Sequence, residues 1–92
     1  MNIESSPAFD RKAKKFFKKR PELKDTFKDF LKVFTLDPFD SKLSTHQINK
    51  KKPKNLYSSS LTSSYRVFTV IKIKDDKAIL VDIGNHDEVY GK

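Results

Sequence analysis

The apolar residues of this chain change their spacing partway along, and this change restricts the possible folds more than any other feature. Between residues 9 and 34, large apolar side chains recur every three or four positions, as they do on one face of a helix. Between residues 66 and 83 the apolar side chains are mostly β-branched and fill both alternating sets of positions, as they do in buried β-strands. Helical spacing followed by strand spacing predicts an α+β domain whose helices pack on a sheet.

Two helices are predicted in the first half of the chain, with a proline between them. Ser6 can cap the first helix because its hydroxyl accepts a hydrogen bond from an amide that has no partner within the helix. Pro7 suits the first helical position because it has no amide hydrogen that would need a partner there. Pro21 ends this helix and opens the second, which ends at residues 37–40. The predicted inner faces consist of Phe9, Ala13, Phe16 and Phe17, and of Leu23, Phe27, Phe30, Leu31 and Phe34. Their spacing indicates that these rings form a core and do not stack on bases.

Three strands are predicted in the second half of the chain and a fourth at its start. Residues 66–74 are rich in β-branched and aromatic side chains, and a turn at residues 75–76 leads into a similar segment at 78–83. Residues 56–62 form a further predicted strand, and residues 2–5 an edge strand. The predicted order is β-α-α-β-β-β, with a helical hairpin on one face of a small, largely antiparallel sheet and the other face left free.

The alternation of side chains also assigns residues to the two faces of this sheet. In the first of the C-terminal strands, one face is predicted to carry Val67, Thr69, Ile71 and Ile73. In the second, Ile79, Val81 and Ile83 are predicted to alternate with Ala78, Leu80 and Asp82.

Length and composition exclude several classes of protein. We expect one domain over residues 1–92, because a chain of this size has no room for a second. No cysteine is available for a disulfide or a thiolate zinc site, and only two glycines are present, so a glycine-rich phosphate loop is excluded. No segment approaches the roughly 20 apolar residues of a membrane span, and the first nine residues do not resemble a signal peptide. We expect a cytoplasmic protein without a metal, a cofactor or a membrane partner.

The balance of charge favours a polyanionic partner. Twenty Lys and Arg residues stand against twelve Asp and Glu, which leaves a net charge of +8, and the excess lies in the first two-thirds of the chain. Lysines bind phosphate without reading bases. The predicted nucleic-acid contacts are Lys24 and Lys28 on the second helix and Lys50, Lys51, Lys52 and Lys54 in the loop after it. The alternative is that lysine-rich helices and a flexible loop serve solubility alone.

Two histidines and an arginine are the groups best suited to acid-base chemistry on a phosphodiester. The strand that begins at Arg66 is expected to run antiparallel to the last strand, so Arg66 and His86 should lie at the same edge of the sheet. If the loop that carries His46 folds over that edge, the two imidazoles, the guanidinium and the phenol of Tyr90 would converge.

Attack by the RNA 2'-hydroxyl needs a base for its proton, a cation for the phosphate and an acid for the departing 5'-oxygen. Histidine, with a usual pKa of about 6.5, can take either proton-transfer role, and the planar guanidinium of arginine suits the phosphate. Each residue also has a structural alternative. His46 could be a bystander, His86 could cap the strand end, Arg66 could pair with Asp82 or Asp87, and the ring of Tyr90 could simply pack on the sheet.

Several short motifs carry a resemblance to a known family. They are Pro7-x-Phe9, Pro21-Glu22-Leu23, Asp37-Pro38-Phe39, Leu43-x-x-His46, Ser64-Tyr65-Arg66-Val67 and the ending Gly84-x-His86-Asp87-Glu88-Val89-Tyr90. With them the chain resembles the RelE/ParE superfamily of bacterial toxins, most closely its RelE and YafQ-like mRNA interferase branch. The resemblance implies a RelE-like fold and a toxin of a type II toxin–antitoxin pair. It also implies a metal-independent endoribonuclease that cleaves mRNA in the ribosomal A site, with mRNA, ribosomal RNA and a cognate acidic antitoxin as partners.

The resemblance assigns roles to four residues. Arg66 matches the arginine that follows an aromatic residue at the start of the central strand, and Tyr90 matches the C-terminal aromatic. His86 corresponds to the C-terminal histidine of YafQ-like toxins, and His46 to the histidine in the loop before the sheet.

The chain departs from the family pattern at two places. Residues 58–60 are serines where RelE has lysines, and Leu61 stands where YafQ-like toxins have a further histidine, so His46 is the simplest candidate for the general base. The missing lysines favour an alternative, a ParE-like toxin that inhibits DNA gyrase without being an enzyme. A second alternative is a degenerate toxin that only binds its antitoxin.

Overall fold

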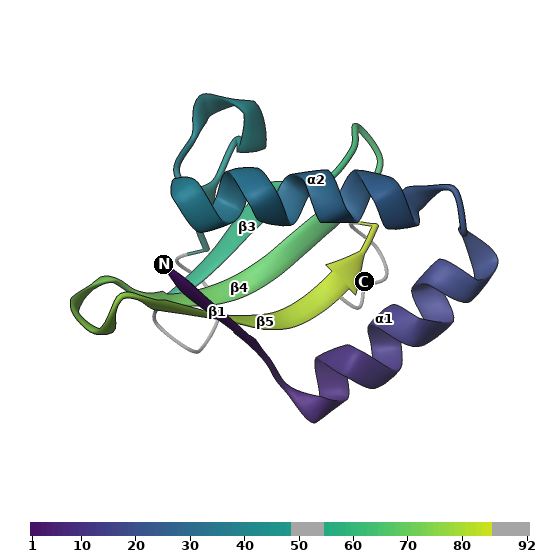
Figure 1. Ribbon diagram of the computed structural model, residues 1–92, viewed down its shortest axis with the longest axis horizontal. Helices are drawn as coiled ribbons and strands as arrows, with labels where there is room; N and C mark the ends of the chain where they lie inside the picture. Colours follow the sequence, from purple (N-terminus) through teal and green to yellow (C-terminus); the bar gives the residue numbers. More distant parts are fainter. Residues whose placement is uncertain (49–54, 86–92) are drawn as a thin grey trace.

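The structure is a computed structural model that describes residues 1–48 and 55–85 (Figure 1). Within these residues the strands are β1 (Asn2–Ser5), β2 (His46–Gln47), β3 (Leu56–Ser60), β4 (Arg66–Lys72) and β5 (Lys77–Gly84). The helices are α1 (Pro7–Lys19) and α2 (Leu23–Leu36), with short 3-10 turns at Ser41–Leu43 and Ile73–Asp75. The predicted α+β class and the order of helices and strands are confirmed.

The strands form a single sheet in the order β1-β5-β4-β3-β2. β1 runs parallel to β5, and the other neighbours are antiparallel, so the sheet is largely antiparallel as predicted. The edge strand predicted at residues 2–5 is confirmed. β2 was expected to be part of a loop, and its two residues become a strand only because they pair with β3.

Local signals in the sequence set the ends of both helices. The amide of Phe9 donates to the Ser6 hydroxyl over 3.0 Å, so the predicted N-cap is confirmed. α1 ends just before Pro21, and α2 ends before Asp37, whose side chain accepts a hydrogen bond from the Phe39 amide over 3.0 Å. Within the described residues, neither helix combines the length and the apolar character that crossing a membrane requires.

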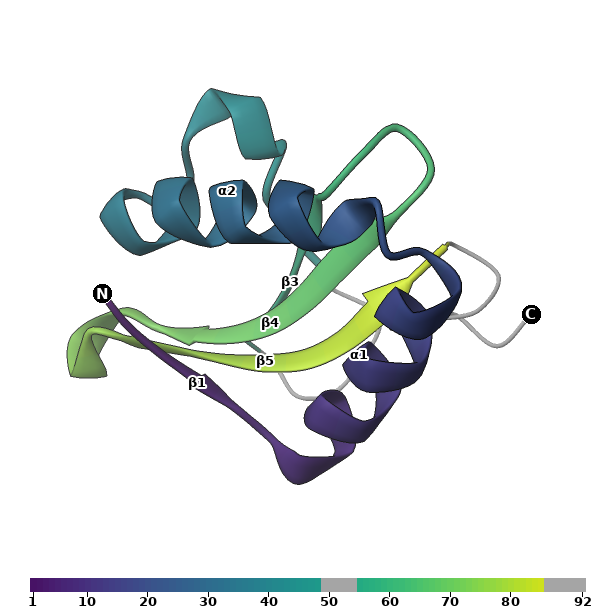
Figure 2. The same ribbon diagram turned by 45° about the vertical axis from the view of Figure 1, so that its right-hand side comes forward.

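The main core lies between the helices and one face of the sheet. α2 runs across this face, while α1 stands beside the end of β5 (Figures 1 and 2). Phe9, Phe16, Phe30 and Phe34 are buried here, and the rings of Phe30 and Phe34 stack with their centroids 5.4 Å apart. Because each fully buried Phe contributes about 1.5–3 kcal/mol of transfer free energy, these rings account for much of what holds the helices on the sheet.

A β-bulge overturns part of the predicted assignment of faces. Phe68 pairs with Asp82 but Thr69 pairs with Leu80, so Val81 is an extra residue in β5. As a result Ile83 is buried in the main core and does not share a face with Val81. The prediction for Ile73 is also wrong, because β4 ends at Lys72 and leaves that side chain 66% exposed.

The face of the sheet away from the helices is not free, contrary to the prediction. Leu56, Phe68 and Val70 are buried in a second cluster on it. Three partly buried residues pack against this cluster: Ile48, Ile79 and Val81. The sheet therefore carries apolar residues on both faces. Each face also has buried polar residues: Ser59 and Thr69 lie on the face of the main core, and Ser58 lies on the second face.

Candidate active site

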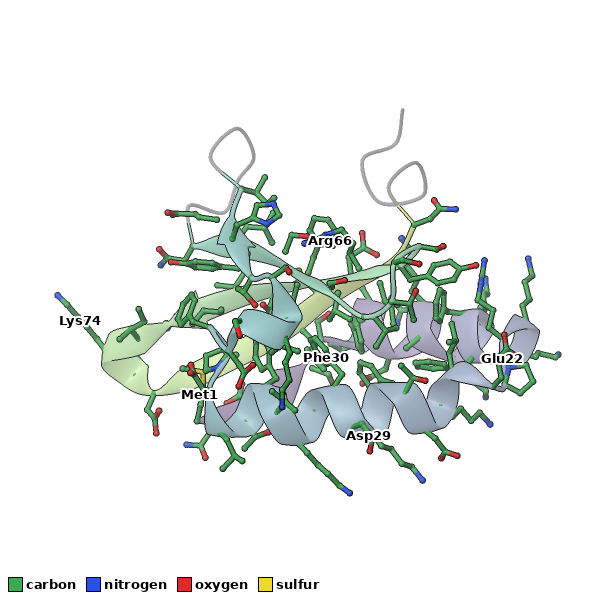
Figure 3. All side chains as sticks on the ribbon, turned by 90° about the horizontal axis from the view of Figure 1, so that it is seen from above. Met1, Glu22, Asp29, Phe30, Arg66 and Lys74 are labelled. Atoms are coloured by element: carbon green, nitrogen blue, oxygen red, sulfur yellow. The ribbon has the colours of Figure 1, made fainter. Side chains whose placement is uncertain are left out.

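Arg66 is the first residue of β4, and its side chain lies on the face of the sheet away from the helices. Its neighbour Val67 is fully buried in the main core, and successive residues of a strand point to opposite faces. Figure 3 shows Arg66 on the opposite side of the sheet from α2, where Asp29 and Phe30 are labelled. The Nε of Arg66 donates to the Ser58 hydroxyl, and its Nη2 donates to the Ser44 carbonyl over 3.4 Å. These contacts hold the guanidinium against β3.

His46 lies next to this guanidinium. It pairs with Ser58 across β2 and β3, and Ser58 is the residue that contacts Arg66. The Nδ1 atom of His46 is 3.3 Å from the carbonyl oxygen of Ser44, which also accepts from Arg66. A carbonyl oxygen can only accept, so this contact requires the proton on Nδ1 and leaves Nε2 of the neutral ring as an acceptor. The structure thus brings His46 and Arg66 together around one carbonyl group.

The loop before β2 is tied to the sheet by side-chain hydrogen bonds. The Thr45 hydroxyl donates to the Pro38 carbonyl over 2.6 Å, and it lies 2.6 Å from the hydroxyl of Ser59. Since the single hydroxyl proton of Thr45 is used on Pro38, Ser59 must be the donor in the second bond. Ser44 itself is left-handed, with φ of 48°, a conformation that costs a non-glycine residue about 1 kcal/mol. These bonds hold the Ser44 carbonyl where Arg66 and His46 share it.

A second arginine fixes the start of β4 from the other side of the sheet. The Nε of Arg20 donates to the Tyr65 hydroxyl over 2.9 Å, and its guanidinium lies 4.4 Å from the ring centre of Phe16 and 4.8 Å from that of Tyr65. The Tyr65 carbonyl accepts from the amide of Leu61 over 2.9 Å, which closes the β3–β4 turn. Tyr65 directly precedes Arg66, so α1 helps to fix the backbone at the candidate site.

Two of the predicted catalytic residues fall on parts of the chain that are not described. His86 and Tyr90 lie outside the described residues, as do Lys50, Lys51, Lys52 and Lys54. The described chain does reach Asn85, and Gly84 pairs with Arg66 across β4 and β5. The predicted approach of His86 to Arg66 stays a prediction.

Lys24 and Lys28 are exposed, but they belong to α2, the helix on the opposite side of the sheet from Arg66 (Figure 3). They are therefore not part of the cluster around Arg66. The alternative pairing of Arg66 with Asp82 is not found: Asp82 pairs with Lys12 over 2.6 Å, and Arg66 bonds to Ser58 and Ser44. Asp87, the other acid considered, lies outside the described residues.

Sequence reasoning missed Ser44 and Ser58, the residues that orient Arg66 and His46. Ser58 is fully buried although serine is a residue type that is mostly exposed. The available signal was the small size of Ser58, because a small polar residue in a strand leaves space for a long side chain from the next strand. Among residues 1–48 and 55–85, no cluster of three or more His, Asp or Glu side chains could hold a metal ion.

Comparison with known proteins places this arrangement in a known fold. A scan against models of protein families finds no match, and neither does a search of curated proteins. Among solved structures, YafQ from E. coli has a TM-score of 0.78 at 15% sequence identity, over 98% of this chain and 98% of that one. A metal-bound toxin from Helicobacter pylori has a TM-score of 0.75 at 25% identity, over 97% of this chain and 98% of that one.

A YoeB/ParE toxin from Agrobacterium tumefaciens has a TM-score of 0.73 at 11% identity, over 94% of this chain and 99% of that one. The chain has the fold of the RelE/ParE toxins. The resemblance inferred from the sequence is confirmed at the level of the fold. YafQ is also among the matching structures as part of a DinJ-YafQ toxin–antitoxin complex. In this RelE/ParE fold, Arg66 and His46 lie on the face of the sheet that the helices do not cover.

Proposed function

We propose that this chain is the toxin of a type II toxin–antitoxin pair and a metal-independent endoribonuclease that cleaves mRNA in the ribosomal A site. The observation that supports it most is the shared contact of Arg66 and His46 with the Ser44 carbonyl. This contact puts a fixed cation beside an exposed imidazole. Attack by the 2'-hydroxyl requires such a pair, with the imidazole to take the proton and the cation to bind the phosphate. The RelE/ParE fold supports the proposal, since toxins such as YafQ share it.

His46 is the proposed general base. With Nδ1 turned to the Ser44 carbonyl, Nε2 can take the proton of the 2'-hydroxyl while the 2'-oxygen attacks phosphorus. The bond from phosphorus to the 5'-oxygen then breaks, and the products are a 2',3'-cyclic phosphate and a free 5'-hydroxyl. His86 is the proposed acid that gives the 5'-oxygen its proton.

Arg66 is the proposed phosphate clamp. Its Nε and Nη2 are engaged with Ser58 and Ser44, and within the described residues Nη1 has no partner, so it can bind a non-bridging phosphate oxygen. Tyr90 is proposed to position the substrate or stack on a base. Lys24, Lys28, Lys50, Lys51, Lys52 and Lys54 stay predicted RNA contacts.

Induced expression of single variants tests the proposed activity. Arg66→Ala, His46→Ala and His86→Ala should each lower A-site cleavage, mapped by primer extension, by about 10²–10⁴-fold and relieve growth arrest. The matched control is Lys74→Ala, which removes an exposed cation at the far end of β4 and should cleave like the wild type. Undiminished cleavage by the Arg66 and His86 variants would end the assignment.

A gyrase inhibitor remains the alternative function, because one fold can host either activity. The observation that favours it is the absence of lysines along β3, where residues 58–60 are serines. Inhibition of gyrase supercoiling by the wild-type chain, with intact mRNA in the same cells, would support this alternative. Intact mRNA together with normal supercoiling would indicate a degenerate toxin that only binds its antitoxin.

The proposed protein partner is an acidic antitoxin. The chain carries a net charge of +8, and YafQ occurs in a toxin–antitoxin complex with DinJ. A small acidic protein encoded next to this chain, and copurifying with it, is the expected finding. Coexpression of that protein should restore growth.

A further inference from the structure

Arg66 begins β4 at the end of the sheet where the two neighbouring strands also stop. Its ladder partners are Ser60, the last residue of β3, and Gly84, the last residue of β5. The ends of strands open more readily than their centres, because a terminal residue has hydrogen-bonded neighbours on one side only. A side chain that binds a reacting phosphate must be held within about 0.5 Å of its working position. A restraint from outside these three strands is therefore needed at Arg66.

The turn that leads into β4 is held in shape by its own hydrogen bonds. The Tyr65 carbonyl accepts from the amides of Leu61, over 2.9 Å, and Thr62, over 3.2 Å. The Thr62 hydroxyl in turn accepts from the Tyr65 amide over 3.2 Å. These bonds join residues of one turn to each other, so they keep its shape without attaching it to a helix.

The side chain of Tyr65 attaches this turn to α1. Successive residues of an extended chain point to opposite sides, and Tyr65 packs against the main core whereas Arg66 lies on the other face. The Tyr65 ring meets the Phe16 ring edge-on, with the centroids 5.1 Å apart. The Arg20 guanidinium lies over both rings, and its Nε donates to the Tyr65 hydroxyl. We call Phe16, Arg20 and Tyr65 the Tyr65 cluster.

Arg20 is itself fixed to the last turn of α1. It is the C-cap residue of that helix, and its amide donates to the Phe16 carbonyl over 3.1 Å. Its Nη1 donates to the same carbonyl over 3.5 Å, so the guanidinium is tied at both ends of its side chain. A planar guanidinium can stack on rings and donate in its own plane at once, which the ammonium group of lysine cannot do.

We propose that Arg20 is a positioning residue for Arg66 and acts through Tyr65. The proposal rests on the proposed function, in which Arg66 binds the phosphate. Because α1 holds the Tyr65 ring, the backbone at the start of β4 cannot rotate, and the direction in which the Arg66 side chain leaves the strand is fixed. Its guanidinium is thereby kept against the Ser58 hydroxyl and the Ser44 carbonyl. Arg20 is on the other side of the sheet and is not proposed to touch the RNA.

Two simpler roles for Arg20 lead to different expectations. If Arg20 only stabilises the fold, its replacement lowers the free energy of unfolding but leaves the cleavage rate of the folded molecules unchanged. If Arg20 only supplies positive charge, lysine should replace it. A positioning role requires that the state of the Arg66 side chain changes and that lysine does not restore it.

Three variants of the full-length chain test the Tyr65 cluster: Arg20→Gln, Arg20→Lys and Tyr65→Phe. Tyr65→Phe keeps the ring and removes only the hydroxyl, so it tests the contact even if the Arg20 variants unfold. The matched control is Arg11→Gln, which makes the same charge change at an exposed position of the same helix. Urea unfolding of each variant shows the fraction that is folded under the assay conditions.

The first measurement reports on the Arg66 side chain directly. The chain contains three arginines, so its ¹H–¹⁵N spectrum has three Nε–H signals, which the single variants assign. The bond to Ser58 should slow the exchange of the Arg66 Nε–H with water. Arg20→Gln should speed this exchange by at least about fivefold and Tyr65→Phe by about twofold, while Arg11→Gln should leave it unchanged.

The second measurement is the single-turnover rate of mRNA cleavage at saturating ribosome concentration. Arg20→Gln should lower this rate by about tenfold to thirtyfold, with KM within about threefold of the wild type, because positioning affects the chemical step. Arg20→Lys should restore little of the rate. Arg20→Gln added to Arg66→Ala should cause no further loss, because a residue that acts through Arg66 has no effect once Arg66 is gone.

Four results would overturn the proposal. They are unchanged exchange of the Arg66 Nε–H in Arg20→Gln and Tyr65→Phe, wild-type cleavage by folded Arg20→Gln, full activity of Arg20→Lys, or a further loss when Arg20→Gln is added to Arg66→Ala. If the exchange changes as expected but the wild type never cleaves mRNA, the proposed function fails and the coupling of Arg20 to Arg66 stands. If the wild type cleaves mRNA and all three variants cleave equally well, only this inference fails.

Discussion

The two faces of the sheet are made by the same strands but carry different kinds of side chain. The face under the helices is mostly apolar, with Phe34 fully buried against it, and it also carries the buried polar residues Ser59 and Thr69. The other face has a small apolar cluster around Phe68 and, beside it, the polar group of Arg66, Ser58 and His46. Most of the stability should therefore come from the first face, and the proposed chemistry from the second. Substitutions on the two faces can separate folding from activity.

Phe34→Ala should have the largest effect on stability. The side chain is fully buried between α2 and the sheet, so its removal leaves a cavity that costs about 3–5 kcal/mol. Such a loss is a large part of the free energy of unfolding of a domain of this size. Urea unfolding followed by circular dichroism measures it, with Leu36→Ala as a control because Leu36 is on the same helix and is 88% exposed. A loss below about 1 kcal/mol would contradict this account of the main core.

Phe68→Ala tests the smaller cluster on the second face. Phe68 is also buried, but among residues 1–48 and 55–85 the cluster around it has only two other buried members, Leu56 and Val70, and can relax more easily. We expect a loss near the lower end of the same range, about 3 kcal/mol, in the same urea measurement. A loss larger than that of Phe34→Ala would reverse the comparison between the faces.

Thr69→Val should stabilise the protein. The Thr69 hydroxyl is buried and has no hydrogen-bond partner among the described residues. Valine has a methyl group of similar size in its place, and burying a methyl group leaves no polar atom without a partner. A buried hydroxyl without a partner costs about 1–3 kcal/mol, so a gain of about 1 kcal/mol in the free energy of unfolding is expected. Thr69→Ser, which keeps the hydroxyl and loses the methyl group, should give no gain. Destabilisation by the valine variant would mean that the hydroxyl is in fact satisfied.

Of these four substitutions, Ser58→Ala is the one expected to lower the proposed cleavage, and its effect on stability should be small. It removes the acceptor of the Arg66 Nε, so the guanidinium loses one of its two anchors, while Arg66 can still be solvated. We expect about a tenfold lower rate of cleavage and a loss of about 1 kcal/mol in unfolding. Ser60→Ala is the control, because Ser60 is on the same strand but its hydroxyl donates to the Thr62 carbonyl over 2.9 Å. Equal effects of both variants on cleavage would show that the contact with Arg66 has no special role.

Features governed by near neighbours in the sequence were predictable. The Ser6 cap, the stop at Pro21 and the helical spacing of Phe30 and Phe34 depend on residues a few positions apart, and all are found in the structure. The side of the sheet on which Ile83 lies was not predictable from alternation, because the bulge at Val81 arises from pairing with β4.

In the candidate site, too, the residue types were predictable from the sequence and the contacts between them were not. Arg66 and His46 could be chosen by residue type, since few other side chains in the chain suit the chemistry. Their meeting at the Ser44 carbonyl depends on the pairing of β2 with β3 and on a left-handed residue in the loop, neither of which has a local sequence signal. The role of Ser58 follows from the same register.

The parallel pairing of β1 with β5 has a consequence for synthesis of the chain. Residues 2–5 are synthesised more than 70 positions before their partners at 77–80. A nascent chain therefore holds β1 unpaired until residues 77–80 have emerged from the ribosome. The sheet cannot be completed before β5 has emerged, so products of this message that stop short of β5 could not form the fold described above.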